Sequence, residues 1–239
     1  MRIIVFHYHL LPGGVTQVIK SSAVAALMHI PGIDGITLVS GRTDNSDKLV
    51  ADIRDSLKGS IPGNIDVESV ILPELGYISD MVNYPDQGIL EDTLLDRFKG
   101  DLWWIHNYHI GKNPFFTEAV LQIGEKFPEQ QMVLHIHDFP EAARYLNLAT
   151  LHQHVTRVLY PVSSNVKYVT INSRDKDYLV AAGVPEEMDF ILNNPVETLE
   201  MERGDGRTEK RGGKIDNVLS KSTAAYIEGA PFMIYPVRT

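Results

Sequence analysis

The sequence predicts an α/β fold: a doubly wound, Rossmann-like and mostly parallel sheet with helices on both faces. Short apolar runs alternate with stretches that place apolar residues at helical spacing, from the N-terminus to about residue 192. The runs at residues 2–7, 102–106 and 132–137 are largely apolar at consecutive positions, as strands covered by helices on both sides must be. Strands and helices that alternate in this way favour parallel pairing with right-handed crossovers.

The first half of the chain predicts three strands, each followed by a helix. The strands are rich in β-branched side chains, and the helices repeat apolar side chains every three or four positions. The strands are expected at residues 2–7, 36–40 and 65–72. The helices are expected at residues 15–29, 46–57 and 90–98.

The second half continues the pattern. The expected strands span residues 102–106, 132–137, 167–171 and 190–192. The expected helices span residues 115–127, 141–148 and 174–182. Pro140 and Glu141 indicate the start of one helix, because proline is favoured in a first turn. Gly183 indicates the end of the last helix, and Pro195 closes the last strand.

The composition divides the chain into three parts. Residues 1–196 are expected to form a Rossmann-like domain, and residues 197–230 hold many charges and glycines, as a linker does. Residues 231–239 again have the pattern of a buried strand. They are expected to begin a truncated second domain or to add an edge strand to the first sheet.

The overall composition limits the partners of the protein. The chain has 239 residues, 44% hydrophobic and 22% charged, as ordinary globular proteins have. Its net charge of -9 argues against a nucleic acid or an anionic membrane as the main partner. There is no cysteine, which excludes disulfides and fits a cytoplasmic location. No apolar run approaches about 20 residues, so no membrane span is expected; a homo-oligomer is left open.

Polar clusters follow three of the apolar strands. They are His7-Tyr8-His9, His106-Asn107-Tyr108-His109 and His135-Ile136-His137-Asp138. Ligands of open α/β sheets bind at the carboxyl ends of the strands, so these clusters are expected to form one site. His137 is the preferred functional residue, because an imidazole beside a carboxylate suits proton transfer or phosphate contact. His29, His152 and His154 are expected to be structural.

Two strand-to-helix loops add further ligand-binding groups. Gly13 and Gly14 allow the backbone to approach a ligand, and the helix N-terminus that follows can hold an anion. A plain turn explains these glycines about as well. Lys112 and Asn113 lie in the loop after the third strand cluster and could bind sugar hydroxyls or an anionic acceptor. A surface turn is the alternative for that pair.

Four segments together resemble the N-terminal half of retaining GT-B glycosyltransferases, the large group that includes sucrose synthases and bacterial mannosyl- and glucosyltransferases. The segments match that group in order over residues 1–196, and the ordered set is more specific than any one motif. They are His9-Leu10-Leu11-Pro12-Gly13-Gly14-Val15, His135-Ile136-His137-Asp138, Asn172-Ser173-Arg174 with Ala182-Gly183-Val184-Pro185, and Leu192-Asn193-Asn194-Pro195-Val196. The last segment departs from the family in having Asn-Pro in place of Asn-Gly.

This resemblance implies a hexosyltransferase of two domains, with the acceptor held by the first domain and the nucleotide-sugar mainly by the second. The present chain would then be the acceptor-side part and inactive alone. His137 would be the catalytic residue, whereas substrate would be bound by a wider set of side chains. That set is His9, Gly13, Gly14, His109, Lys112, Asn113 and Asp138. No metal and no cofactor are implied, the nucleotide-sugar being a co-substrate.

Two other classes of function are compatible with the same residues. One is a metal-dependent hydrolase that uses the strand-end side chains of His7, His9, His135, His137 and Asp138. The other is a non-catalytic domain that binds a sugar or a nucleotide. Near-stoichiometric metal would favour the hydrolase, and ligand binding without turnover would favour the binding domain.

Overall fold

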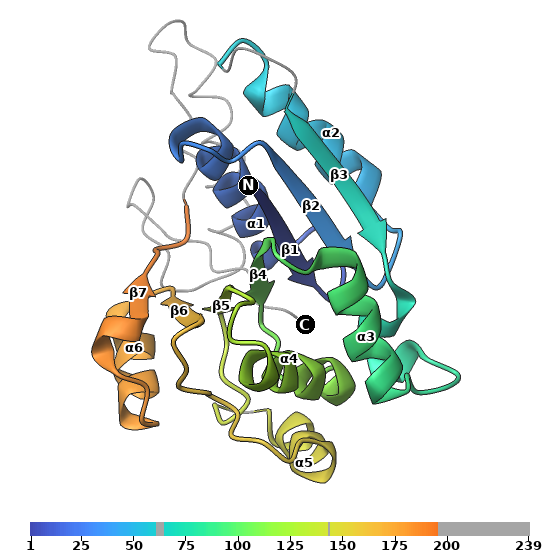
Figure 1. Cartoon of the computed structure of the whole chain (residues 1–239), viewed down its shortest axis with the longest axis vertical. Helices are drawn as coiled ribbons and strands as arrows, with labels where there is room; N and C mark the ends of the chain where they lie inside the picture. Colours follow the sequence, from blue (N-terminus) through green and yellow to red (C-terminus); the bar gives the residue numbers. More distant parts are fainter. Residues whose placement is uncertain (61–64, 143, 196–239) are drawn as a thin grey trace, which may run out of the picture. The chain divides into compact units, whose positions relative to one another are not determined.

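A parallel sheet of seven strands forms the centre of the structure, as expected for a doubly wound α/β fold (Figure 1). This computed structural model describes residues 1–60, 65–142 and 144–195. The strands run in the order β3-β2-β1-β4-β5-β6-β7, and every neighbouring pair is parallel. They are β1 (Arg2–His7), β2 (Gly35–Ser40), β3 (Asp66–Ile71), β4 (Leu102–His106), β5 (Met132–Ile136), β6 (Val166–Thr170) and β7 (Asp189–Ile191).

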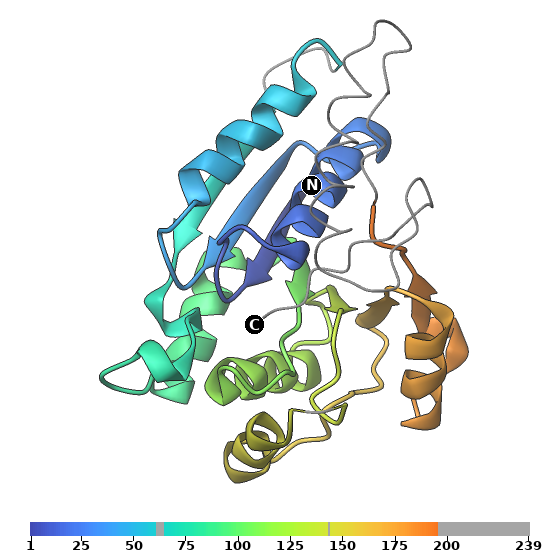
Figure 2. The same ribbon diagram turned by 180° about the vertical axis from the view of Figure 1, so that it is seen from behind.

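Helices cover both faces of the sheet. On one face α1 (Gly14–His29) and α2 (Ser46–Leu57) contact each other and bury their apolar sides on β1, β2 and β3 (Figure 2). On the other face lie α3 (Gln87–Phe98), α4 (Pro114–Lys126) and α6 (Ser173–Ala181). The remaining helix, α5 (Tyr145–His154), contacts α4. Three short 3-10 helices complete the described part: η1 (Pro73–Leu75), η2 (Ile78–Asp80) and η3 (Glu186–Met188).

β1 is buried on both faces, whereas β4 and β5 are fully buried on the side of α3 and α4 and partly buried on the other, at Leu102, Trp104 and Val133. Ile3 and Val5 of β1 pack toward α1 and α2, whereas the alternate residues Ile4 and Phe6 pack toward α3 and α4. The core on the second face includes Trp103, whose indole N–H donates to the Phe98 carbonyl at 2.9 Å. Each face thus has its own hydrophobic core, and together the cores hold β1, β4 and β5 near the middle of the sheet.

The helix predicted at residues 141–148 is placed wrongly by the sequence pattern. The segment after β5 instead turns, with the Ala142 N–H donating to the Phe139 carbonyl at 3.1 Å, and α5 begins only at Tyr145. Glu141 accepts a hydrogen bond from the Tyr160 hydroxyl, which fixes it in the turn. The apolar side chains that suggested the earlier helix are not buried, since Leu146 is 86% exposed.

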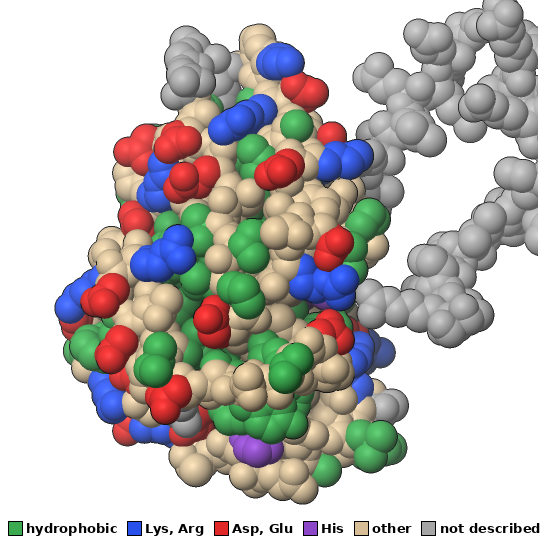
Figure 3. All heavy atoms as spheres, turned by 90° about the vertical axis from the view of Figure 1, so that its right-hand side faces the viewer, with side chains coloured by type: hydrophobic (Ala, Val, Ile, Leu, Met, Phe, Trp, Pro, Cys, Tyr) green, Lys and Arg blue, Asp and Glu red, His purple; other side chains and the backbone are tan. Residues whose placement is uncertain are grey.

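Of the three predicted parts of the chain, the structure describes only the first. Met1–Pro195 forms one compact unit. The predicted linker at residues 197–230 and the predicted strand at residues 231–239 lie outside the described residues. No helix of the described part is long and apolar enough to cross a membrane. On the face shown in Figure 3, acidic and basic side chains are interspersed, so this face carries both signs of charge.

Candidate functional site

Every sequence-predicted site residue lies at one edge of the sheet, because all the strands are parallel and end there. Gly13 and Gly14 follow β1, Lys112 and Asn113 follow β4, and His137 follows β5. This carboxyl edge is where open α/β sheets bind their ligands. Among the hollows along it, one lies near the end of β5 and another near the ends of β2 and β3.

A cluster of imidazoles links the ends of β4 and β5. His106 and His135 are register partners on adjacent strands, and their ring centroids lie 4.7 Å apart. His137, two residues further along, stacks on His135 with centroids 4.1 Å apart. Its Nε2 lies 2.9 Å from Nδ1 of His106. We call His106, His135 and His137 the histidine cluster; the two side chains of the His-x-His pair share one side, as predicted.

The backbone of Asn107 positions this cluster. Asn107 has a left-handed conformation (φ 54°), which short polar side chains adopt more readily than others. Its N–H donates to the His135 carbonyl at 2.9 Å, and its Oδ1 accepts from the His137 N–H at 2.8 Å. The buried Tyr8 hydroxyl holds the same turn by donating to the carbonyls of Asn107 and Tyr108. The ends of β1, β4 and β5 are therefore tied to one another.

Burial keeps the histidine cluster neutral at physiological pH. Loss of solvent lowers the pKa of His137 to about 4, with Asp138 acting weakly in the opposite direction. Burial and the neighbouring His137 lower the pKa of His135 to about 2. Burial also holds the pKa of His106 well below its usual value, and the adjacent imidazoles of His135, His137 and His7 add to the effect. A neutral His137 can donate or accept a hydrogen bond but brings no positive charge.

The cavity beside His137 measures about 450 Å³ and is lined by charged groups. We call it the His137 pocket, and its lining includes Asp138, Arg144, Arg174 and Tyr178. Arg144 forms an ion pair with Asp138 at 3.0 Å, and the more exposed Arg174, in the first turn of α6, pairs with Asp175 at 3.3 Å. Each guanidinium is therefore matched by a carboxylate, and an anionic ligand in this pocket would compete with Asp138 and Asp175 for the arginines.

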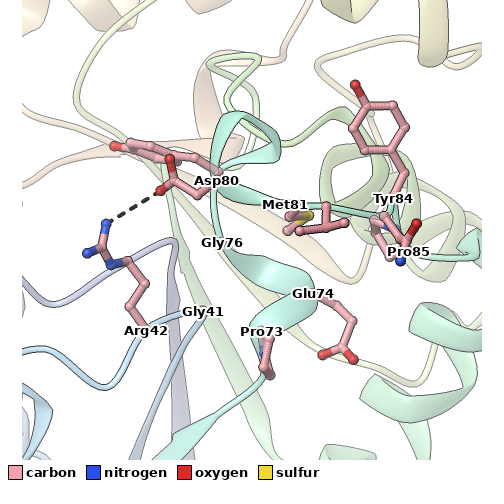
Figure 4. Close-up of a pocket in the computed structure, with 12 residues that line it drawn as sticks. Gly41, Arg42, Pro73, Glu74, Gly76, Asp80, Met81, Tyr84 and Pro85 are labelled. Carbon is pink, nitrogen blue, oxygen red and sulfur yellow. Dashed lines mark hydrogen bonds and ion pairs between the residues drawn. The ribbon is translucent and has the colours of Figure 1, made fainter.

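A larger cavity of about 840 Å³ lies at the ends of β2 and β3, and we call it the Tyr77 pocket (Figure 4). Arg42 and Asp80 form an ion pair across it at 3.4 Å, and Tyr77 lines one wall. His9 Nε2 lies 3.0 Å from the Tyr77 hydroxyl, and Lys112 Nζ lies 5.1 Å from the centroid of the Tyr77 ring. The predicted residues His9 and Lys112 therefore both contact Tyr77, and they lie beside the pocket rather than in its lining.

Gly41 supports the floor of the Tyr77 pocket by close backbone contact with Gly76. A Cβ at residue 41 would lie 2.1 Å from the Gly76 nitrogen, a contact that no relaxation of a side chain removes. Gly41→Ala is therefore expected to lower the free energy of unfolding by about 1 to 3 kcal/mol, as overpacking does. Denaturant titration measures this change. Gly88→Ala in α3 is the control, because its Cβ would lie 3.4 Å from its nearest neighbour; equal destabilisation by both variants would contradict the assignment.

Other predicted residues are placed where they hold the structure. Asn113 is fully buried: its Oδ1 caps α4 by accepting from the Phe116 N–H, and its Nδ2 donates to the carbonyls of Glu74 and Gly76. His109 is also fully buried, with its ring 5.5 Å from that of Tyr160. Neither side chain is open to a ligand in this structure. The two side chains instead fix the loops that surround the pockets.

Gly13 and Gly14 are exposed at the N-terminus of α1. A Cβ on Gly14 would meet no atom within 4 Å, so the fold itself leaves space there. The first N–H groups of a helix have no partner within the helix, so this end is open to an anion. His7 lies between this loop and the histidine cluster, with its ring centroid 6.4 Å from that of His106.

The ligand set expected for a metal hydrolase does not assemble as predicted. His135 and His137 lie together, but their third neighbour is His106, which was not in the predicted set. His7 Nδ1 faces the His106 carbonyl and His9 faces Tyr77. The Asp138 carboxylate pairs with Arg144. Sequence reasoning could have found His106, because it ends a strand next to the one that carries His135; nothing in the local pattern indicated Arg42, Tyr77 or Arg144.

Comparison with known proteins identifies one curated relative. The chain is 32% identical over 201 residues to the mannosylglucosyl-3-phosphoglycerate synthase of Petrotoga mobilis, an alignment that covers 81% of the chain. It covers only 37% of that synthase, so the chain spans little more than a third of the length of the relative. No protein-family model matches.

Among solved structures, a 6-phospho-α-glucosidase from gut microorganisms, in complex with NAD and Mn²⁺, aligns with 78% of this chain and 43% of its own. The TM-score is 0.35 and the identity 11%, which is too low to carry an inference.

Proposed function

We propose that this chain is the acceptor-side part of a retaining GT-B glycosyltransferase, which moves a hexose from a nucleotide-sugar to an acceptor. The observation that carries the proposal is the 32% identity with a mannosylglucosyl-3-phosphoglycerate synthase over 201 residues. The parallel sheet and the ligand-binding character of its carboxyl edge are consistent with it. A sheet of this kind hosts many activities, so the fold adds support without selecting the reaction.

The name of the relative describes a product in which mannosyl and glucosyl units are joined to 3-phosphoglycerate. An acceptor of that type carries a phosphate and a carboxylate at one end and sugar hydroxyls at the other. The Tyr77 pocket would offer such a molecule the Arg42 guanidinium and the aromatic face of Tyr77, with the Lys112 ammonium nearby. The carboxylates of Glu74 and Asp80 lie in the same lining and suit the sugar hydroxyls better than the phosphate. We assign the acceptor to this pocket, with His9 in contact with Tyr77 and with Gly13 and Gly14 in the loop that follows β1.

The His137 pocket is assigned to the transferred sugar and the leaving phosphate. His137 would donate or accept a hydrogen bond that strengthens as the donor bond breaks, with Asp138 beside it. Arg144, Arg174 and the N-terminus of α6 would offset negative charge on the leaving phosphate by exchanging their carboxylate partners for it, and no metal or other cofactor is assigned to the transfer step. A second domain would bind most of the nucleotide-sugar. The chain alone would then bind an acceptor without transferring sugar.

Transfer can be tested with a protein that contains this chain together with the remaining length found in the relative. Mass spectrometry should detect a hexose added to glucosyl-3-phosphoglycerate when a nucleotide-activated mannose is supplied. Lys112→Gln is expected to raise the KM for this acceptor about 10-fold and to change kcat less, since one charged contact contributes about 1.5 kcal/mol or more.

The matched control is Lys99→Gln, because Lys99 is exposed and pairs with Glu129 at the opposite edge of the sheet. It should leave KM unchanged. No transfer to any sugar phosphate or glycerate acceptor, across a panel of nucleotide-sugars, would overturn the proposed function. An unchanged KM in Lys112→Gln would remove Lys112 from the acceptor pocket.

A further inference from the structure

The histidine cluster is a compact group of three imidazoles. One potential ligand nitrogen from each of His106, His135 and His137 lies within 4.8 Å of the others. The nearest pair, Nδ1 of His106 and Nε2 of His137, is separated by 2.9 Å. The residues come from the ends of two adjacent strands, and the Asn107 turn fixes both strand ends in place. The cluster is therefore held by the fold.

Three nitrogens of this cluster are buried and have no hydrogen-bond partner. They are Nε2 of His106 and both ring nitrogens of His135, in side chains that are 1% and 0% exposed. Each buried polar atom without a partner costs about 1 to 3 kcal/mol, and such atoms are rare in folded proteins. Three such atoms in two neighbouring rings leave bonding capacity that a bound group would complete.

The chemistry of the cluster favours a transition metal over water or a harder cation. All the ligand atoms are imidazole nitrogens, which suit Zn²⁺, Co²⁺ and Ni²⁺, whereas Mg²⁺ and Ca²⁺ require oxygen ligands. His137 also lines the His137 pocket, so an ion can enter from that side.

We propose that His106, His135 and His137 form a binding site for one divalent transition-metal ion, with Zn²⁺ as the best fit. Each residue supplies one nitrogen, and the fourth position of a tetrahedral site is left toward the His137 pocket. The rings of His135 and His137 lie 19° from parallel, so they must rotate for their lone pairs to converge on the ion. The sequence indicated His135 and His137 as possible metal ligands but not His106, and the existence of the site does not depend on the proposed function.

The test is a titration of the untagged, metal-free protein with Zn²⁺ by calorimetry, and with Co²⁺ by visible absorption. One equivalent should bind, and Co²⁺ should show the intense bands of a tetrahedral nitrogen site. His135→Phe keeps the ring that stacks on Trp104 but removes both nitrogens. This variant should weaken metal binding by about 100-fold or more, because losing a ligand costs more than losing a residue that only hydrogen-bonds a ligand. His137→Gln, at the pocket, is a second variant that should weaken binding similarly.

The matched control replaces His152 and His154 on α5 by asparagine, because these exposed histidines are the alternative source of adventitious binding. Binding should be unchanged in this control, and the melting temperature of each metal-free variant verifies that it is folded. Absence of stoichiometric Zn²⁺ and Co²⁺ binding would overturn the proposal. Wild-type affinity in folded His135→Phe or His137→Gln, or loss of binding in the α5 control, would do so equally.

Discussion

His137→Ala is expected to lower the turnover of sugar transfer by on the order of 10²-fold in a protein that contains this chain and its donor-binding part. The ring lies at the end of a central strand, lines a pocket with two arginines and is neutral. A contact that strengthens as the donor bond breaks acts on the transition state, so kcat should fall more than acceptor binding. Initial rates at saturating acceptor and donor measure the effect.

His152→Ala is the control for this experiment, since His152 is exposed on α5 away from both pockets. Its kcat should equal that of the wild-type protein. Because the pKa of His137 is lowered to about 4, this group stays neutral above pH 6, and turnover should show no step from its titration between pH 6 and 8. Unchanged kcat in His137→Ala would remove the residue from the site.

Mild acid is expected to destabilise the fold strongly. Burial lowers the pKa of His137 to about 4, of His109 to about 3 and of His135 to about 2, and lowers that of His106 as well. In the unfolded chain each imidazole has a pKa of about 6.5, so it binds a proton below that pH, whereas in the folded chain it stays neutral. The stability is therefore complete above pH 6.5 and is lost as the pH falls toward the folded-state values. His137, with its pKa of about 4, contributes a loss of about 1 to 2 kcal/mol between pH 6.5 and 5, and the other histidines act in the same direction.

Denaturant unfolding of the metal-free protein at a series of pH values measures this loss. His135→Phe removes one of the contributing imidazoles, so its stability should fall less steeply than that of the wild-type protein. His29→Gln is the matched control, because His29 is exposed at the end of α1. Equal stability at pH 7 and pH 5 would show that these histidines are protonated in the folded state.

Most of the fold could be predicted from the sequence because the signal is local. Buried parallel strands need continuous apolar runs, and the runs that became β1, β4 and β5 have them. The helix expected at residues 141–148 is wrong because two contacts fix a turn after β5. The Tyr160 hydroxyl, from a residue distant in sequence, donates to Glu141, and the Phe139 ring packs against the hydrophobic core. The apolar spacing of this segment predicted a buried helix face, but Leu146, which belongs to that pattern, is exposed.

For the site, the sequence predicted only the residues that follow directly from where the strands end. The His-x-His spacing placed His135 and His137 on one side, and the parallel topology placed His9 and Lys112 at the same edge. Asn113 and His109 could not be separated from ligand-binding residues, because their burial depends on long-range contacts with η1, Gly76 and Tyr160. The same holds for the Tyr77 pocket, whose walls come from the ends of different strands.

Binding of the two substrates to the 239-residue chain tests the central assignment most directly. Calorimetry and backbone NMR should detect glucosyl-3-phosphoglycerate, with shifts concentrated at Arg42, Tyr77 and Lys112. Nucleotide-activated mannose should bind far more weakly, because most of its contacts belong to the proposed second domain. Tight binding of the nucleotide-sugar, with no response to the acceptor, would contradict the assignment of this chain as the acceptor-side part of a glycosyltransferase.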